Sequence, residues 1–327
     1  MLENETISKN FKEILQKYGE DISVVNYDKL EIPNKPASRT VRRRFGSWVK
    51  AKREVLSKDV IKPKSNICET NYKTEKFKAD SRLAFLPDAH LIPKLGPHES
   101  YLVAKEFVKD MQPEIIIIGG DLVEMDSLSY FTKNKLLLLE GQRYQDDVDM
   151  GKKELEDIRN SCPKSRMVFL KGNHELRVDR YIEEVPTLVG KLDIRKDLGI
   201  DDFGIEWVEY NDVIPIGGMN YIHGWFWNMY HARKTLQTMG DNVMYGHVHE
   251  FQVYIQNVRM KQMPHIAISC GCLTSVNPEY VRGKPTRFVN GFGFVEYRSD
   301  GSFQPSHISI VNGEMTYGGR TWKVTKI

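Results

Sequence analysis

Five short apolar runs, each stopping abruptly at Gly, Asp, Asn or His, constrain the fold of this chain more than any other feature of its sequence. Runs of this length predict strands that are buried on both faces. Between two of them, Ala104, Phe107, Val108 and Met111 recur at helical spacing. The pattern predicts an α/β domain whose polar clusters gather at the carboxyl ends of the strands, where such sheets bind ligands. The runs are LAFLPDAH (83–90), IIIIGGD (115–121), MVFLKGNHE (167–175), MNYIHG (219–224) and NVMYGHVH (242–249).

Five of the nine histidines fall within these runs, together with aspartates and an asparagine. Imidazole and carboxylate are the ligands that Mn, Fe and Zn prefer, whereas all-oxygen sites suit Mg or Ca. Asp88 and His90 stand two apart, as do His247 and His249, so on extended strands each pair would point to one side. Seven candidate ligands exceed the need of one metal and fit two metals, roughly 3.5–4 Å apart, that share a carboxylate. They are Asp88, His90, Asp121, Asn173, His223, His247 and His249.

The order D-x-H, G-D, G-N-H-E, H-G and G-H-x-H resembles that of the calcineurin-like metallophosphoesterases over residues 82 to about 275. In this chain no ligand of that pattern is missing or replaced. The resemblance implies a four-layer α/β/β/α metallophosphoesterase sandwich over residues 81–327. It also implies a hydrolase that acts on phosphate ester bonds with two divalent metal ions, Mn²⁺ in the first place and Fe or Zn as alternatives.

The same resemblance implies a role for each residue. A hydroxide shared by the two cations would attack phosphorus in line, while the metals neutralise charge on the phosphoryl oxygens. His174 would be the catalytic residue that stabilises the transition state or protonates the leaving oxygen. The first metal would be held by Asp88, His90 and His249, the second by Asn173, His223 and His247, and Asp121 would bridge them.

Several neighbouring residues have two interpretations. Glu175 either orients the histidine before it or is a surface acid, and Arg177 either meets a substrate phosphate or has an exposed structural role. His98 could line the substrate cleft, but its position favours the start of a helix. Tyr130 and Phe131 could stack on a base, but we interpret them as core residues.

The first quarter of the chain is basic and has a helical pattern. Residues 1–80 carry 18 Lys and Arg against 12 Asp and Glu, and residues 35–64 carry eleven basic residues against two acids. An apolar stripe from Ile7 to Leu15 predicts one helix. Ser38 predicts the cap of a second, and Ser47 that of a third. Such a high density of basic residues is typical of a solvated face or, beside a helix-turn-helix pattern, of a surface that binds a polyanion.

The stretch from Phe11 to Leu56 resembles the small DNA-binding repeat attached to homing endonucleases, in Ser38-Arg39-Thr40 and in Arg43 to Trp48. The resemblance implies DNA as a partner, with phosphate or groove contacts from Arg42, Arg43 and Arg44. We therefore predict a three-helix domain over residues 1–57. Residues 58–80 are polar and show no clear period, which predicts a linker.

The remaining composition excludes other classes of protein. No apolar run approaches the ~20 residues of a bilayer span, and the first thirty residues lack the pattern of a secretory signal. We expect a cytoplasmic site of action, in the host cell if the gene belongs to a phage. Four scattered cysteines are too few for a disulfide framework. Cys270 and Cys272 fit packed positions of a strand.

These patterns leave three hypotheses of function. The first is a nuclease or DNA-processing enzyme that hydrolyses phosphodiester bonds and is delivered to DNA by its N-terminal domain. The second is a phosphatase or phosphodiesterase acting on small nucleotides or phosphoproteins, with the N-terminal domain as an adaptor. The third is a non-catalytic DNA-binding protein with a vestigial site, which the intact ligand set disfavours. We predict the first, encoded by a phage or mobile element, because the basic N-terminal region would bring DNA to the metals.

Overall fold

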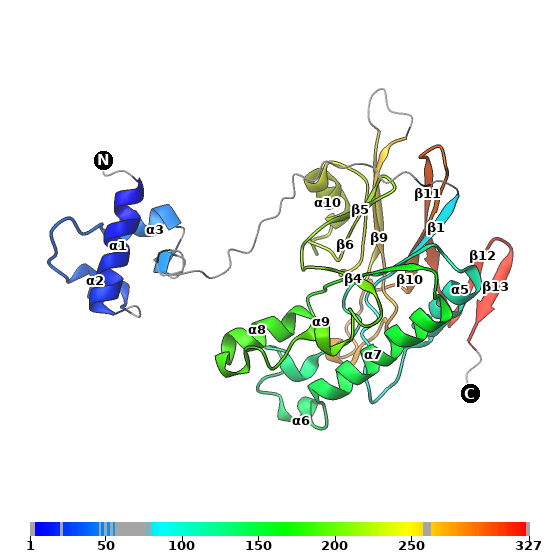
Figure 1. Ribbon diagram of the computed structural model, residues 1–327, viewed down its shortest axis with the longest axis horizontal. Coiled ribbons are helices and arrows are strands. Elements are labelled where there is room, and N and C mark those ends of the chain that lie inside the picture. The colour runs from blue at the N-terminus through cyan, green and yellow to red at the C-terminus, as the bar shows by residue number, and fades with distance from the viewer. Residues whose placement is uncertain are drawn as a thin grey trace. The chain divides into compact units, whose positions relative to one another are not determined.

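A computed structural model describes residues 4–19, 22–45, 47–48, 51–52, 55, 77, 80–257 and 263–324. The chain divides into two compact units, Met1–Thr70 and Asn71–Ile327 (Figure 1). Of the predicted linker over residues 58–80, only residues 77 and 80 lie within the described parts of the chain. In those parts, none of the helices combines the length and the apolarity that a bilayer span requires.

The N-terminal unit is a small helical body around an aromatic centre. The rings of Phe11, Tyr27 and Trp48 meet edge to face, with centroids 4.8 to 5.5 Å apart. Val41 is fully buried beside them, and the Tyr27 hydroxyl donates to the carbonyl of Pro36 at 2.8 Å. The helices are α1 (Asn4–Tyr18), α2 (Val24–Asp28) and α3 (Ser38–Phe45).

Two details of this unit differ from the sequence prediction or fall outside it. Ser38 does not cap α3 from outside, because it is the first residue of the helix and its hydroxyl donates to the carboxylate of Asp28 at 2.8 Å. Of the third predicted helix, Trp48, Ala51 and Val55 are described as buried, and much of the rest lies outside the described residues.

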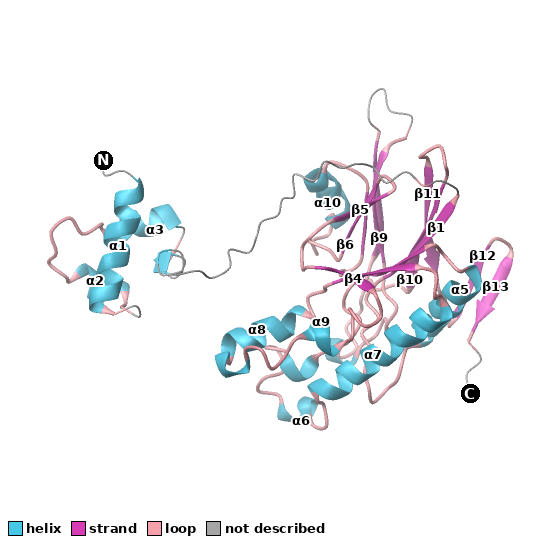
Figure 2. Cartoon of the chain, viewed as in Figure 1, coloured by secondary structure: helices cyan, strands magenta, loops and turns pink. Residues whose placement is uncertain are grey.

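The second unit contains two mixed β-sheets and a separate hairpin, as Figure 2 shows, which confirms the predicted α/β class. One sheet has the order β11-β10-β1-β2-β3-β4, with β1 to β4 parallel, and the other has the order β5-β6-β7-β9-β8, with β6, β7 and β9 parallel. All five apolar runs form strands of these sheets. The six-stranded sheet contains β1 (Ser81–Leu86), β2 (Ile115–Ile118), β3 (Arg166–Leu170), β4 (Ile205–Val208), β10 (Gly291–Tyr297) and β11 (Phe303–Ser309). The five-stranded sheet contains β5 (Ile214–Ile216), β6 (Met219–Ile222), β7 (Val243–Tyr245), β8 (Phe251–Gln256) and β9 (His265–Cys270), and the hairpin pairs β12 (Glu314–Tyr317) with β13 (Arg320–Lys323).

Three apolar clusters hold the layers of this unit together. Leu83 and Phe85 of β1 face Tyr221 and Met244 of the second sheet. Ala84 and Leu86 alternate with them, because successive strand residues point to opposite faces, and pack on the side of α5 and α7. A third cluster joins the other face of the five-stranded sheet to α10. The helices are α5 (Glu99–Met111), α6 (Leu136–Leu139), α7 (Tyr144–Ser161), α8 (Leu176–Glu184), α9 (Ile194–Asp197) and α10 (His231–Met239), with short 3-10 turns η1 (Asp126–Leu128), η2 (Pro186–Leu188) and η3 (Glu279–Val281).

Candidate metal centre

The seven predicted ligands stand in loops that follow five strands of the two sheets. The loops after β1, β2 and β3 supply Asp88, His90, Asp121 and Asn173, and the loops after β6 and β7 supply His223, His247 and His249. Because the ends of these strands face a common edge, residues up to 161 positions apart in the chain gather in one place.

The backbone at these loops is unusual. Five of the ligands have a positive φ: Asp88 at 45°, His90 at 42°, Asp121 at 50°, His247 at 69° and His249 at 62°. Left-handed backbone is strained for residues other than glycine and concentrates at functional sites. The expected reason for the D-x-H and H-x-H spacing is therefore wrong. These pairs do not sit on extended strands, and each side chain is aimed by a left-handed turn beyond the strand end.

One group of three ligands, called here the first triad, comprises Asp88, His90 and His249. Their ligand atoms all lie within 4.8 Å of one another, and the three residues are buried. The Nε2 atoms of the two histidines approach to 3.1 Å, and Asp88 Oδ1 lies 3.4 Å from His249 Nε2. Within the described parts of the chain, Asp88 Oδ1 and His249 Nδ1 are buried without a hydrogen-bond partner. The first triad could hold a metal ion.

A second triad comprises Asp121, His223 and His247, again with ligand atoms within 4.8 Å of one another. His223 Nε2 lies 3.4 Å from Asp121 Oδ2 and 3.0 Å from Asn173 Oδ1. The other ring nitrogen of His223 donates to the carbonyl of Gly119 at 2.8 Å, which turns Nε2 toward the site. This triad could also hold a metal ion.

Asp121, a member of the second triad, also faces the first triad. Its Oδ2 lies 3.4 Å from His223 Nε2 and 3.8 Å from His90 Nε2, so one carboxylate oxygen faces ligands of both. Each triad also draws on both sheets, because its carboxylate follows a strand of the six-stranded sheet and at least one histidine follows a strand of the other.

The two aspartates are held in the same way. Asp88 Oδ2 accepts from the backbone N–H of His247, and Asp121 Oδ1 accepts from the backbone N–H of His174, each at 2.8 Å. One oxygen of each carboxylate is therefore used to fix a neighbouring loop, and the other is left facing the histidines.

Glycines allow these loops to approach so closely. A Cβ built on Gly172 would lie 2.2 Å from Asp121 Oδ1, and one on Gly246 would lie 2.1 Å from Asp88 Oδ2. A Cβ on Gly120 would lie 2.6 Å from His223 Nδ1. The glycines of the motifs G-D, G-N-H-E and G-H-x-H thus make the space in which the aspartates and histidines meet.

The electrostatics of the centre favour a cation. Burial would lower the pKa of His223, but Asp121 and Asp88 raise it to about 10. Burial likewise opposes the charge of His90, yet Glu124, Asp121 and Asp88 raise its pKa to about 9. Burial would raise the pKa of Asp121, while the surrounding histidines hold it well below its usual value. The negative potential that attracts protons here would also attract a divalent metal, whose binding releases them.

Glu124 is a site residue that the sequence analysis missed. Its Oε2 lies 2.9 Å from His90 Nδ1, on the side of the ring opposite the first triad. Its backbone carbonyl accepts from His174 Nδ1 at 2.6 Å and from Arg177 at 2.7 Å. Burial opposes its ionisation, but the adjacent His90 and His174 lower the pKa of Glu124 to about 2. Its position three residues after Asp121, in the same loop, was the available signal.

His174 pairs with Arg177 and also belongs to the centre, because its ligand atom and those of His90 and Asp121 form a third group within 4.8 Å of one another. Because Nδ1 of His174 donates to the Glu124 carbonyl, its Nε2 accepts from the Arg177 guanidinium at 3.0 Å. Burial lowers the pKa of His174 to about 4, against the attraction of Asp121. The Arg177 side chain is only 14% exposed and pairs with Asp126 at 2.9 Å, so an exposed structural role for it is wrong.

Glu175 is fully buried and serves neither of the roles considered for it. Its carboxylate accepts from the backbone N–H groups of Asp121, Leu122 and Gly172, each at 2.9 Å. It therefore ties the loop after β2 to the loop after β3. Burial and the nearby charge of Asp121 raise the pKa of Glu175 to about 7.

Other residues considered from the sequence lie apart from this chemistry. His98 caps α5, as its interpretation as a helix-start residue predicts. Tyr130 and Phe131 are 76% and 77% exposed, so the interpretation as core is wrong; they follow η1 in a surface segment in which residues 133–138 are exposed as well. Cys270 and Cys272 are buried free thiols in and beside β9, as expected. Arg42, Arg43 and Arg44 are exposed at the end of α3 in the other unit.

Comparison with known proteins finds two similar phage proteins. A protein of Mycobacterium phage D29 and one of Mycobacterium phage L5, both named "Gene 54 protein", are 25% and 24% identical to this chain over 234 residues. The matched region covers 67% of this chain and 90% of each relative. No family model matches the chain.

Proposed function

We propose that the second unit is a two-metal phosphoesterase with the calcineurin-like α/β/β/α sandwich. The observation that carries the proposal is a pair of triads, buried except for the half-buried His247, that approach one another at a single carboxylate, Asp121. This geometry suits two cations that share a ligand, an arrangement that clamps a phosphoryl group. Asp88, His90 and His249 would hold one ion, and His223, His247 and Asn173 the other. The donor set of imidazole, carboxylate and amide favours Mn²⁺, with Fe or Zn as alternatives.

Bound metals would supply Lewis acidity toward the phosphoryl oxygens and a water molecule with a lowered pKa. The chain's own contribution follows from the pair of His174 and Arg177. A histidine whose pKa lies near 4 is neutral at physiological pH, so His174 is poorly suited to protonate a leaving oxygen. His174 is instead well suited to position Arg177. The permanent charge of Arg177 would then stabilise the negative charge that develops on the phosphate. Of the two roles expected for His174, transition-state stabilisation is therefore the better supported.

We further propose that the substrate is DNA. Arg39, Arg42, Arg43 and Arg44 are exposed along α3, a helix without an acidic residue in its first turn. The phosphate backbone of DNA binds such surfaces through charge. A first unit bound to DNA would raise the effective concentration of phosphodiesters for the second unit, because both units belong to one chain. The phage origin of the two relatives supports a phage-encoded enzyme that acts in the host cytoplasm.

A second candidate is hydrolysis of small nucleotides or phosphoproteins. It is favoured by one observation: every residue of both triads belongs to the second unit. That unit would then hydrolyse esters alone, with the first unit as an adaptor.

The test compares the full chain with a fragment spanning Asn71–Ile327, which is a compact unit of its own. Both are assayed with Mn²⁺ on plasmid, linear and single-stranded DNA, on bis-p-nitrophenyl phosphate and on p-nitrophenyl phosphate. We expect both proteins to cleave the small diester equally and to lose activity with a chelator. We expect the fragment to cleave DNA several-fold more slowly.

Each other outcome has a definite meaning. Undiminished turnover after exhaustive chelation would refute the two-metal proposal. Equal DNA cleavage by both proteins would refute delivery by the first unit. Hydrolysis of the small esters alone, without any DNA cleavage by the full chain, would establish the second candidate instead.

A further inference from the structure

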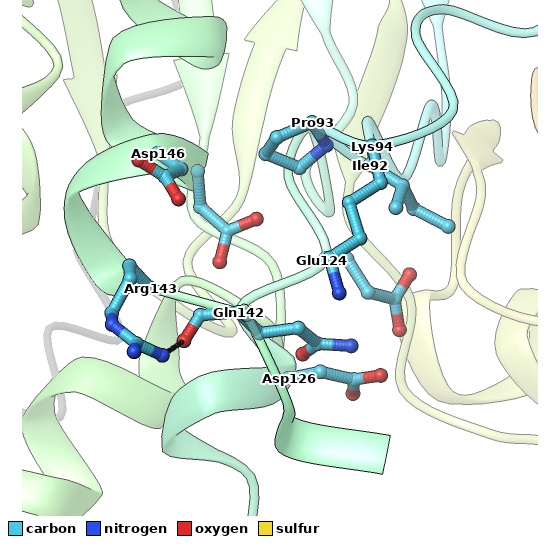
Figure 3. A pocket seen from close by; sticks show the side chains of 10 residues that line it. Ile92, Pro93, Lys94, Glu124, Asp126, Gln142, Arg143 and Asp146 are labelled. Atoms are coloured by element: carbon cyan, nitrogen blue, oxygen red, sulfur yellow. Dashed lines mark hydrogen bonds between the residues drawn. The ribbon is translucent and has the colours of Figure 1, made fainter. Parts of the chain in front are cut away.

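A cavity of about 290 Å³ adjoins the metal centre (Figure 3). It lies between the loop after β1, the loop after β2 and the start of α7. Figure 3 shows Lys94, Glu124, Asp126 and Asp146 around the same space, with Gln142 and Arg143 on the segment that leads into α7. Its volume is at the lower end of the range for small-molecule sites, roughly 300–1,000 Å³, which suits a single planar group.

Asp147 is the most buried of the carboxyl residues in this wall. It is 5% exposed and lines the cavity. In the part of the chain that the structure describes, its carboxylate makes no hydrogen bond or ion pair, whereas Glu124 contacts His90 and Asp126 pairs with Arg177. A buried carboxyl group without a partner is costly. Burial and the surrounding acids raise the pKa of Asp147 to about 7.

The cavity and the metal centre share a wall. The side chain of Glu124 lines the cavity, and its Oε2 lies 2.9 Å from Nδ1 of His90, a member of the first triad. A group bound in the cavity would therefore be one side chain away from a phosphate at the metals. This separation suits two parts of the same nucleotide.

The charges of the cavity decide which chemistry it accepts. Four carboxyl groups against Lys94 and Arg143 disfavour a phosphate. A metal is also disfavoured, because among the described residues the groups of three ligands within reach of one ion all lie at the metal centre. Of the parts of a nucleotide, this leaves the base, which can donate hydrogen bonds to a carboxylate and accept them from Lys94, Arg143 or Gln142.

Guanine has this pattern among the bases. Its N1–H and N2–H₂ groups lie side by side and match the two oxygens of one carboxylate, while O6 and N7 are acceptors. Cytosine and adenine each present one amino group, and thymine presents none. We propose that the cavity binds a guanine base of the substrate, with Asp147 accepting hydrogen bonds from N1–H and N2–H₂. This inference rests on the proposed function for the class of substrate, a nucleotide phosphodiester.

The first experiment measures base preference with 5′-p-nitrophenyl phosphates of the four deoxynucleosides, which differ only in the base. With Mn²⁺, the kcat/KM for the guanine ester should exceed that for the thymine ester by about tenfold or more, the discrimination expected of one bidentate pair. Asp147→Asn should bring this ratio near one. Asp149→Asn is the matched control, because Asp149 is an exposed residue of α7 outside the cavity, and it should keep the wild-type ratio. Equal kcat/KM for the four esters in the wild type would overturn the inference.

The second experiment does not depend on catalysis. Binding of deoxyguanosine and of thymidine to the metal-free full chain is measured by calorimetry or ligand-observed NMR, with Asp147→Asn alongside. Preferential binding of deoxyguanosine that Asp147→Asn abolishes is expected, and no preference would overturn the cavity assignment. If that binding is found while no phosphate ester is hydrolysed, the proposed function fails and the cavity assignment stands. If esters are hydrolysed without base preference, the cavity assignment fails and the proposed function stands.

Discussion

The unpartnered carboxyl group of Asp147 has a consequence for stability that can be measured without any substrate. A carboxyl group whose pKa is higher in the folded than in the unfolded state destabilises the fold as pH rises between the two values. Here the pKa rises from 3.8 to about 7. At about 1.4 kcal/mol per pKa unit, the full shift corresponds to roughly 4 kcal/mol, an upper limit because the cavity side admits water. The effect is absent below about pH 4, grows through the interval and levels off above pH 7.

Asp147→Asn removes the charge with little change of shape. We expect the variant to match the wild type near pH 4 and to exceed its free energy of unfolding by roughly 2–4 kcal/mol at pH 8. For a unit of this size, each kcal/mol corresponds to about 2–4 °C in Tm. Denaturant unfolding of both proteins is followed from pH 4 to 8 in chelator, with Asp149→Asn as the exposed control. A difference that does not grow with pH would refute the reasoning, since it would mean that the carboxylate is solvated or paired.

The remaining predictions concern the metal centre and the basic helix. Asp121→Asn should abolish hydrolysis and lower the bound metal, measured by elemental analysis; full activity would exclude it as a shared ligand. His174→Ala should keep both metals but lower kcat by about 10²–10³-fold, and loss of metal would place it among the ligands instead. Glu124→Gln should weaken metal binding by roughly 10–100-fold through His90, and an unchanged affinity would contradict the importance of the hydrogen bond between them. Replacing Arg42–Arg44 with Ala in the full chain should reduce the slope of log K against log salt for duplex DNA by about 0.9 for each phosphate that these arginines neutralise; an unchanged slope would leave α3 as a solvated face.

Much of the site could be predicted because the apolar runs have a direct physical meaning. A buried strand must be apolar on both faces, so the residue at which the run stops marks the place where the chain leaves the core. IIIIGGD shows this plainly, since β2 is Ile115–Ile118 and Asp121 follows in the loop. Parallel strands bring the polar residues that follow these runs to one edge of the sheet. For this reason the ligand types could be predicted without knowing the order of the strands.

The rest depends on contacts between distant segments. Glu124 matters because the loops after β1 and β3 place His90 and His174 against it, and its position three residues after Asp121 does not reveal these contacts. Glu175 matters because three backbone N–H groups converge on it. Tyr130 shows the reverse, because its aromatic side chain suits a core and yet is 76% exposed. Local patterns identify groups that favour burial, while tertiary contacts decide which of them are buried.

The division of each triad between the two sheets gives the centre a mechanical role. A cation held by Asp88, His90 and His249, or by Asp121, His223 and His247, would cross-link one sheet to the other at their common edge. These cross-links would oppose movement of one sheet past the other, because such movement would stretch bonds to the metal. Without a metal, it would only rearrange apolar contacts such as that between Phe85 and Tyr221. Because the unfolded chain has no such site, the free energy of metal binding would add to the free energy of folding. A chain whose four cysteines are few and scattered would thereby gain, from bound metal ions, links between residues up to 161 positions apart.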